Sequence, residues 1–328
     1  MWDLHRLRLL HELRLRETVT AVARTLDYSL SSVSQQLAKL EDEVGVRLLE
    51  PDGRRLRLAP EGLRVAAHAA RVLDLEEDVR SELQAGLPVA ETVRIASLES
   101  TARALVPHAL TALRETAPHL RLEAAVVPPE TGLAELEARG YDIAVAEQYP
   151  GHTREHRDLL DRTSLGHDPV RLVVPRDAAV TDLAGAAGLP WVMEPEGTAA
   201  RYWAVQQCRA AGFEPDIRFD SASLDVHVHL IRAGHAAGLL PDLVWTGDRS
   251  GVRTIALPGP SHRELFTSVR RTTRDRPSIR AVRAALSRAF DALGPPQPDR
   301  PGGGAGAPAR PDVADPAGRS PSVSPRPL

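Results

Sequence analysis

The sequence is poor in cysteine, because Cys208 is the only one among 328 residues. A single cysteine can form no internal disulfide and, without partners, no thiolate metal site. From the burial preference of this residue type, we expect Cys208 to be a half-buried helix residue.

Long apolar runs and an excess of basic charge are also missing. No run of about 18 apolar residues could span a bilayer. Residues 1–8 lack the apolar segment and small-residue cleavage site of a secretory signal, so we expect a cytoplasmic protein. The net charge of -3 is unlike that of a histone-like protein, and any DNA contact must come from a local surface. Lys39 is the only lysine among 41 basic residues, which indicates the coding bias of a GC-rich genome.

The motifs that would indicate catalysis are absent or weak. The sequence has no Walker motif, no strand-linked G-x-G-x-x-G and no G-x-S-x-G elbow. Residues 152–156 spell the inverted zinc-protease pattern H-x-x-E-H, but they follow a loop signal at 149–151 and no third ligand is evident. Asp225, His227 and His229 would share a face only on a strand, and we expect a helix there. The sequence therefore predicts no enzyme, no metal site and no cofactor.

The apolar pattern divides the chain into successive parts. Residues 1–59 show helical periodicity, residues 60–87 contain one long helix, and residues 88–293 alternate short strands with helices. From residue 294 onward, Pro, Gly, Ala and Ser dominate and predict a disordered tail, 294–328. The expected strands are 93–96, 122–127, 141–146, 170–174, 191–193, 217–219, 237–240 and 265–269, and the expected helices are 102–115, 131–139, 198–211, 224–233 and 279–293.

The α/β part predicts two lobes in series. We expect lobe I at about 88–163 and 262–293 and lobe II at about 164–261. Each would have a largely parallel sheet flanked by helices, and small ligands bind in clefts at the strand ends of such sheets.

The long helix after residue 60 carries an apolar stripe. Pro60 suits the first helical position, and Glu61 favours the positive end of the helix dipole. Packing against the same helix of a second chain would cover the stripe, and packing on the protein's own domains is the alternative. The residues of the stripe are Leu63, Ala66, Ala70, Val72, Leu75, Val79 and Leu83.

Residues 18–41 predict a helix-turn-helix. Residues 20–26 read as a helix, 27–29 as a turn and 30–40 as a second helix, whose inner face is Val33, Leu37 and Leu40. The other face has hydroxyls, amides and one cation without a carboxylate. Amides can read adenine edges and hydroxyls can bond phosphates, although a solvated polar face would have the same composition. The candidate DNA-binding residues of the turn and helix are Ser29, Ser31, Ser32, Ser34, Gln35, Gln36 and Lys39.

The order of motifs after this helix resembles the signature of LysR-type transcription regulators. Residues 40–50 read Leu-Glu-Asp-Glu-Val-Gly-Val-Arg-Leu-Leu-Glu, a basic segment follows at 52–58, and Pro-Glu-Gly follows at 60–62. The Ser-x-x-Ser-x-x-Leu frame of residues 31–37 also matches. Weaker matches are the strand segment 136–145 and the Gly-rich turn 233–241. The resemblance covers residues 1 to about 290.

The resemblance implies a fold, partners and site residues. The fold is a winged helix-turn-helix rich in helices, a linker helix for dimerisation, and a two-lobed α/β domain like a periplasmic binding protein. The implied partners are double-stranded DNA with a dyad-symmetric site, a small-molecule effector and a second copy of the chain, as a homodimer or tetramer. Arg54, Arg55 and Arg57 would be wing residues near phosphates or the minor groove.

Three positions depart from the family pattern. Leu30 stands where a polar residue is usual, Pro51 replaces a basic residue, and Ala59 replaces a threonine that would cap the linker helix. Losing such a cap costs about 1 kcal/mol, which Pro60 and Glu61 partly offset.

The same resemblance places an effector between the lobes, next to the loop after the first strand. Hydroxyls and helix N-termini there favour an anion, so a carboxylate effector is one hypothesis, which nearby acids such as Glu99 weaken. The alternative function is a ligand-binding module or metal-dependent hydrolase whose N-terminal helices mediate interactions. The candidate effector-binding residues are Ser97, Ser100, Thr101, Glu147, Thr198, Arg201, Ser221 and Ser223.

Overall fold

The computed structural model describes residues 1–328 except 53–54, 85–90, 153, 155–156, 246–248 and 294–328. The wing residue Arg54 and the predicted tail therefore lie outside the described residues. No described helix is long and apolar enough to cross a membrane.

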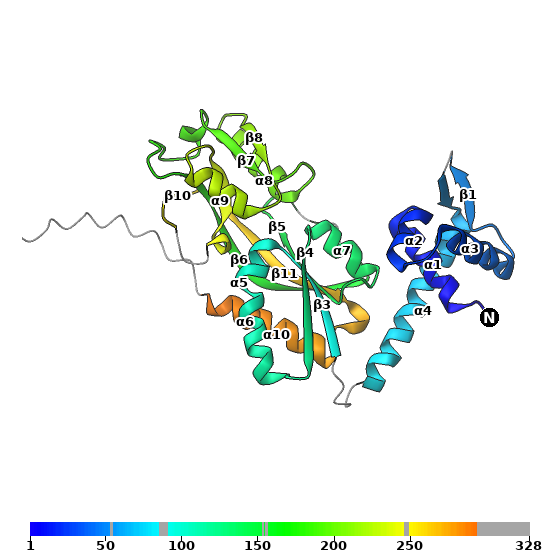
Figure 1. The fold of residues 1–328 in the computed structure, drawn as a ribbon. Coiled ribbons are helices and arrows are strands. Elements are labelled where there is room, and N and C mark those ends of the chain that lie inside the picture. Colours follow the sequence, from blue (N-terminus) through cyan, green and yellow to red (C-terminus); the bar gives the residue numbers. More distant parts are fainter. Residues whose placement is uncertain (53–54, 85–90, 153, 155–156, 246–248, 294–328) are drawn as a thin grey trace, which may run out of the picture. The chain divides into compact units, whose positions relative to one another are not determined.

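The N-terminal part has three short helices, a hairpin and one long helix (Figure 1). Thr18 and Ser29 cap the second and third helices by accepting from the backbone N–H of Ala21 at 3.2 Å and of Ser32 at 3.1 Å. Asp27 ends the second helix in the left-handed conformation, with φ of 56°. The expected helix-turn-helix is present, and its second helix extends four residues beyond the prediction. The elements are α1 (Leu4–Arg16), α2 (Val19–Leu26), α3 (Leu30–Val44), β1 (Leu49–Asp52), β2 (Arg55–Leu58) and α4 (Pro60–Gln84).

One apolar core holds these helices together. The expected inner face of α3 is fully buried, and Ala23 of α2 is buried with it. Residues from α1 and α4 complete the same cluster. The crossing of α2 and α3 therefore follows from apolar spacing along both helices.

The junction between α3, the hairpin and α4 explains two residues of the family signature, Glu41 and Gly62. Glu41 accepts from the backbone N–H groups of Leu48 at 2.8 Å and Leu49 at 3.0 Å, which ties the end of α3 to the start of β1. Gly62 lies so close to this strand that an added Cβ would be 2.0 Å from the Leu48 carbonyl oxygen. Only glycine permits this approach.

The α/β part is built on a sheet with strand order β10-β6-β11-β5-β3-β4, and β9 also pairs with β6. Strands β3, β4 and β5 are parallel, whereas β11 runs antiparallel to both β5 and β6. The bounds of the strands in this sheet are β3 (Glu91–Ser97), β4 (Leu120–Val126), β5 (Ile143–Gln148), β6 (Leu160–Pro175), β9 (Gly238–Pro241), β10 (Val252–Ala256) and β11 (His262–Arg270).

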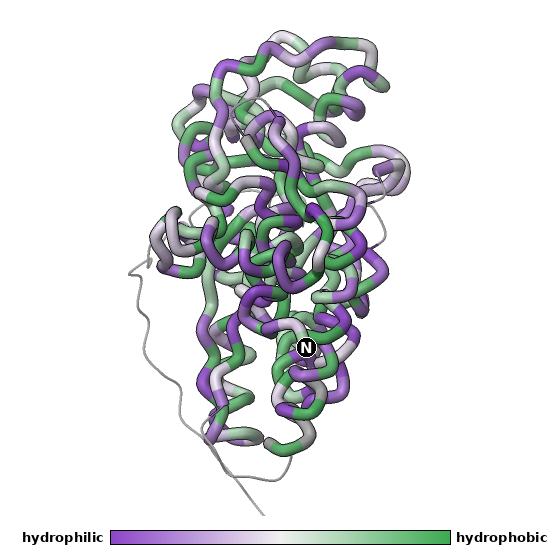
Figure 2. Tube along the Cα trace, turned by 90° about the vertical axis from the view of Figure 1, so that its right-hand side faces the viewer, coloured by the Kyte–Doolittle hydropathy of each residue, from purple (hydrophilic) through white to green (hydrophobic). Residues whose placement is uncertain are grey.

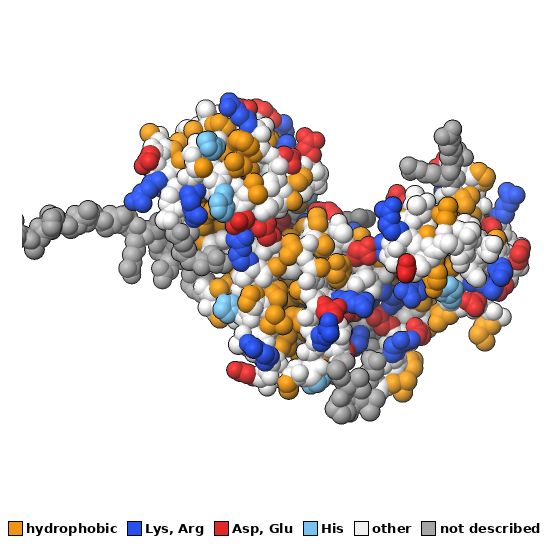
Figure 3. Space-filling view, viewed as in Figure 1, with side chains coloured by type: hydrophobic (Ala, Val, Ile, Leu, Met, Phe, Trp, Pro, Cys, Tyr) orange, Lys and Arg blue, Asp and Glu red, His pale blue; other side chains and the backbone are white. Residues whose placement is uncertain are grey.

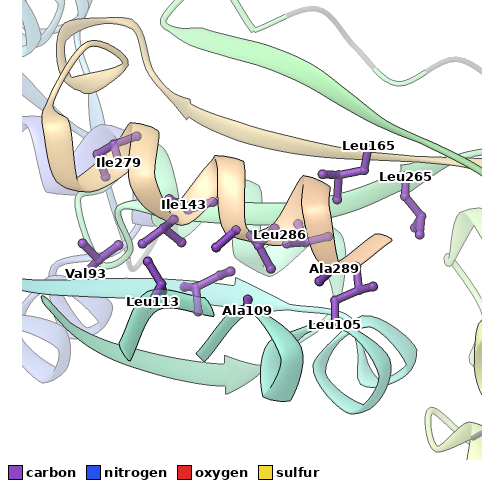
Figure 4. Close-up of a cluster of buried hydrophobic side chains, with 14 of the residues drawn as sticks. Val93, Leu105, Ala109, Leu113, Ile143, Leu165, Leu265, Ile279, Leu286 and Ala289 are labelled. Atoms are coloured by element: carbon purple, nitrogen blue, oxygen red, sulfur yellow. The ribbon is translucent and has the colours of Figure 1, made fainter. Parts of the chain in front are cut away.

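We call the elements around β3, β4 and β5 the first lobe. Its helices are α5 (Glu99–Ala104), α6 (Val106–Thr116), α7 (Pro129–Glu137) and α10 (Pro277–Ala292). Alternate strand residues face opposite layers: Ile143 contributes to the core with α6 and α10, and Ala144 contributes to the core with α7. Figure 4 shows Ile279 and Leu286 of α10 pointing into the first of these cores.

We call the elements around the β7-β8 pair the second lobe. They are β7 (Pro190–Met193), α8 (Ala199–Ala210), β8 (Asp216–Asp220) and α9 (Leu224–Arg232), together with β9 and β10. The second half of β6 again separates two cores, with Leu172 on the side of α8 and Val173 on the side of α9. Figure 2 shows hydrophobic and hydrophilic residues interspersed along these elements, as expected when each buries one face.

Several expected elements need correction. The helix predicted over 102–115 is two helices, because Leu105 interrupts it just before Pro107. Strand β6 begins ten residues before the predicted 170–174, and β10 has no counterpart in the prediction. Cys208 is fully buried rather than half-buried.

The predicted stripe of α4 also divides into two faces. Ala66 is buried in the N-terminal core and Ala70 is also buried, whereas Leu75, Val79 and Leu83 are 65%, 54% and 73% exposed. The helix thus has one face for its own domain and a second apolar face without a cover among the described residues.

Candidate DNA-binding and effector sites

The outer face of α3 presents most of the predicted DNA-binding residues to solvent. Ser31, Ser34, Gln35 and Lys39 are exposed. Among the described residues no salt bridge is formed by Lys39, so its charge is available to a phosphate.

Several of the predicted residues have structural partners, and even the exposed Ser31 has its hydroxyl oxygen 3.0 Å from that of Ser29. Ser29 caps α3, and Ser32 is half-buried and donates its backbone N–H to that cap. Gln36 is half-buried and accepts from Arg6 Nε at 2.9 Å. The exposed residues of α3 are therefore better placed for base contacts than Gln36, whose amide oxygen is already bonded.

The β1–β2 hairpin forms the expected wing. Arg57 on β2 is exposed and pairs with Glu50 on β1 at 2.7 Å. The β2 position of Arg55 is described, but its side chain is not. The departures from the family pattern are tolerated: Leu30 is 52% exposed at the start of α3, and Ala59 is buried, with its N–H bonded to the Leu48 carbonyl.

A buried ion cluster occupies the centre of the two-lobed part. Arg263 on β11 is 2% exposed. It donates to Glu147 on β5 at 2.7 Å, to Asp168 on β6 at 2.9 Å and to Ser100 on α5 at 2.6 Å. Asp168 also accepts from the backbone N–H of Leu243 at 3.1 Å. The cluster joins three strands and a helix where β6 passes from one lobe to the other.

Two predicted hydroxyls of the first lobe are engaged with each other. Ser97 and Thr101 are 1% exposed, and their hydroxyl oxygens lie 2.8 Å apart. That they act as ligand donors in the cleft stays a prediction, since each hydroxyl has a partner within the first lobe here. Their bond stabilises the turn into α5.

A carboxylate of the first lobe reaches the start of a second-lobe helix. Glu99 on α5 accepts from the backbone N–H of Leu224 at 2.8 Å and from Ser223 Oγ at 3.3 Å. Arg103, one turn along α5, pairs with Asp225 at 3.2 Å. Figure 3 shows acidic side chains gathered where α5 and α9 face each other. The lobes are thus bonded through the positive end of α9, where an acid is favoured.

The predicted hydroxyls of the second lobe lie at two helix starts. Thr198 caps α8 by accepting from the N–H of Arg201 at 3.2 Å, and Arg201 pairs with Asp220 at 3.0 Å. Ser221 accepts from the N–H of Ser223 at 3.1 Å before α9. These residues shape the loops on the second-lobe side: the hydroxyls of Thr198 and Ser221 bond the backbone, and that of Ser223 bonds Glu99.

A small cavity of about 20 Å³ lies in the second lobe beside these loops. Its walls include Tyr149, Glu194, Arg201, Trp203 and His227. Burial, and then repulsion by Glu147, raise the pKa of Glu194 to about 8. Burial lowers the pKa of His227, whose Nε2 is 2.8 Å from the Ser221 carbonyl oxygen.

Sequence reasoning missed Arg263, Asp168, Glu194 and Trp203. No local motif marks the ion cluster, because its members are isolated polar residues in strands far apart along the chain. Glu194 had a weak signal: it directly follows a buried strand, the position from which α/β proteins direct side chains into a cleft.

Of the two possible metal motifs in the sequence, one lies mostly outside the described residues and the other is on a helix. His152 and Arg154 are described, but the rest of the 152–156 pattern lies outside the described residues. His227 and His229 lie on α9, as expected, so they point to different faces. In the described part of the chain no group of three His, Cys, Asp or Glu residues could hold a metal ion.

Comparison with known families identifies both parts of the chain. Residues 4–63 match the family "Bacterial regulatory helix-turn-helix protein, lysR family", and residues 88–291 match the family "LysR substrate binding domain".

Curated relatives match over most of the chain. It is 28% identical over 280 residues to the transcriptional dual regulator GltC of Bacillus subtilis, covering 81% of this chain and 93% of that protein. It is 27% identical over 237 residues to the DNA-binding transcriptional dual regulator OxyR of Escherichia coli, covering 70% of this chain and 76% of that one.

Solved structures share the fold. A single-residue variant of full-length OxyR from Pseudomonas aeruginosa matches with a TM-score of 0.62 at 20% identity, covering 88% of this chain and 95% of that chain. Full-length BenM matches with a TM-score of 0.54 at 18% identity, covering 91% and 100%. The expected winged helix-turn-helix with a two-lobed α/β domain is therefore confirmed.

Proposed function

The chain belongs to the LysR family of DNA-binding transcription regulators, and we propose that it reads a dyad-symmetric DNA site through the exposed face of α3. The observation that supports this most strongly is the carboxylate-free surface of Ser31, Ser34, Gln35 and Lys39. Amides and hydroxyls there can bond base edges, and the lysine can bond a phosphate. Arg57 of the wing, which pairs with Glu50 here, would add a second cation if it exchanged this carboxylate for a phosphate.

We assign to each part of the chain the role that the sequence predicts for it. Residues 1–59 bind DNA, 60–87 dimerise the chain, and 88–293 bind the effector in a cleft between the lobes. The exposed apolar face of α4 supports pairing with a second copy, as a dimer or a dimer of dimers. Such a regulator works in the cytoplasm, where it meets DNA.

The effector would act by shifting the balance between arrangements of the lobes. A ligand can do this only if it binds one arrangement more tightly than the other. The Glu99–Leu224 bond joins the lobes here, so a ligand that enters the cleft must either keep or replace it.

The test is selection of genomic fragments by the purified full-length protein. A variant carrying Ser34→Ala and Gln35→Ala is run beside it. The matched control carries Thr111→Ala and Thr116→Ala, which remove two exposed hydroxyls from α6. We expect the wild type and the control to recover one dyad-symmetric sequence, and the α3 variant to lose or relax it.

Recovery of unrelated fragments by all three proteins would contradict specific readout by α3. The alternative, a metal-dependent hydrolase with interaction helices, predicts stoichiometric zinc in the purified protein. We infer action by binding rather than catalysis, because the central carboxylates Glu147 and Asp168 are held by Arg263.

A further inference from the structure

The second-lobe cavity contains a carboxyl group without a partner. Glu194 directly follows β7 and lines the cavity. Among the described residues, neither a hydrogen bond nor an ion pair is formed by its side chain, although Arg201 donates to its backbone carbonyl at 3.1 Å. The Glu194 side chain is half-buried, and a carboxyl group that is partly withdrawn from water without a partner costs free energy, so it indicates either a functional group or a strained site.

The neighbouring cations are already neutralised. Arg263 is held by Glu147 at 2.7 Å and Asp168 at 2.8 Å. Arg201, which also lines the cavity, pairs with Asp220 at 3.0 Å and lies 3.5 Å from Glu196. An anionic ligand would therefore have to break an existing ion pair, whereas a cation would meet an unpaired acid.

A second unpaired group lines the same cavity. Trp203 on α8 is 3% exposed, and its indole Nε1 is buried without a hydrogen-bond acceptor among the residues that the structure describes. Its ring stacks on Tyr149, with centroids 5.2 Å apart. The cavity thus offers one donor, one acid and an aromatic wall, a combination suited to an organic cation that also carries an acceptor.

We propose that this cavity opens to bind a small primary amine. Glu194 binds the ammonium group, and the Trp203 indole N–H donates to a neutral oxygen of the ligand. The proposal rests on the proposed regulatory function, because it names the chemical class of the effector. It replaces the carboxylate suggested by the hydroxyls and helix starts.

The size of the cavity connects binding to movement. A volume of about 20 Å³ holds about one water molecule. An amine must therefore displace part of the wall. Tyr149 directly follows β5 of the first lobe but packs in the same core as Trp203, so opening this wall disturbs the second-lobe core at the point where the chain leaves β5.

The experiment is calorimetric titration of the full-length protein with matched probes. Ethanolamine, 4-aminobutanol and tyramine are each compared with the carboxylate and the alcohol of similar skeleton, up to about 10 mM. Glu194→Gln removes the charge while keeping the size of the side chain. Glu214→Gln removes an exposed carboxylate elsewhere in the second lobe and serves as the control.

We expect at least one amine to bind the wild type and the Glu214→Gln protein, and its affinity to fall at least tenfold in Glu194→Gln. Tighter binding of a carboxylate, no binding of any amine, or equal binding to Glu194→Gln would overturn the proposal. The fragment selection is scored separately. If the protein still selects a common DNA sequence but binds no amine, only the proposed ligand class is wrong. If it selects no common DNA sequence, the proposed regulatory function is wrong.

Proton release gives a second readout. Glu194 is mostly protonated at pH 7, and the ammonium group requires the carboxylate, so binding should release close to one proton. Titration in phosphate and in MOPS, whose ionisation enthalpies differ and neither of which is a primary amine, measures this number, and the affinity should rise about tenfold from pH 6 to pH 7. Absence of proton release would overturn the assignment to Glu194. The charged and titratable groups around it are Glu99 of α5, Glu130 of α7, Glu147 and Tyr149 at β5, Arg201 of α8, His227 of α9 and Arg263 of β11.

Discussion

Glu99 of the first lobe accepts a hydrogen bond of 2.8 Å from the backbone N–H of Leu224, the first residue of α9 in the second lobe. The carboxylate occupies the place that a helix-capping side chain or an anionic ligand would take. In this conformation the chain itself supplies the acid at the start of α9.

We therefore expect Glu99→Ala to loosen α9. The amide of Leu224 loses a charged acceptor, which costs about 1–3 kcal/mol locally. Hydrogen exchange of a peptide covering residues 221–228 should accelerate, while a peptide from α10 should keep its rate. Equal protection in both proteins would show that the bond does not hold the lobes.

Removing the central arginine should destabilise the two-lobed part. Arg263→Ala leaves Glu147 and Asp168 buried without their cation, at a cost of about 3–5 kcal/mol. A triple variant with Arg263→Met, Glu147→Gln and Asp168→Asn removes all three charges and should recover part of the loss. Calorimetric unfolding of the full chain compares them. A single variant as stable as the wild type would contradict this account of the cluster.

The free energy of unfolding should depend on pH through Glu194. Its folded pKa of about 8 lies above the unfolded value of 4.5, so its contribution is present below pH 4.5 and is lost as the pH rises to 8. At about 1.4 kcal/mol per unit, the loss reaches up to about 5 kcal/mol. Glu194→Gln should therefore be more stable than the wild type at pH 8 and similar to it at pH 5. Denaturant unfolding at both pH values measures this, and parallel pH profiles would argue against a raised pKa of Glu194.

Gly62→Ala should destabilise the DNA-binding part. Its Cβ would meet the Leu48 carbonyl oxygen at 2.0 Å, and overpacking of this kind costs about 1–3 kcal/mol. Gly188→Ala is the control, since nothing lies within 4 Å of an added Cβ there. The midpoint of thermal unfolding should fall only for Gly62→Ala. An unchanged midpoint would mean that the strand can move away.

The exposed face of α4 should hold two copies together. Replacing Leu75, Val79 and Leu83 by glutamine removes apolar area that a partner would bury. Light scattering after gel filtration should show a smaller species than the wild type. Leu110→Gln, at another exposed leucine on α6, should leave the assembly unchanged. A variant of wild-type mass would place the interface elsewhere.

Local sequence patterns determined much of the N-terminal part. The spacing of Val33, Leu37 and Leu40 defined the buried face of α3, and the polar residues between them defined its exposed face. Glu41 and Gly62 belong to the family signature in the sequence, but their contacts with Leu48 are seen only in the folded structure. Such short-range patterns succeed because helix periodicity and capping depend on neighbours in the chain.

What only the tertiary structure decided is how polar residues pair across the two lobes. Arg263, Glu147 and Asp168 come from three strands, and nothing in the local sequence of any one of them indicates the other two. Whether a hydroxyl such as Ser97 is free or already bonded likewise depends on what folds against it. Periodicity fixes which face of an element is buried, whereas long-range packing fixes which charges meet there and which one, Glu194, is left for a ligand.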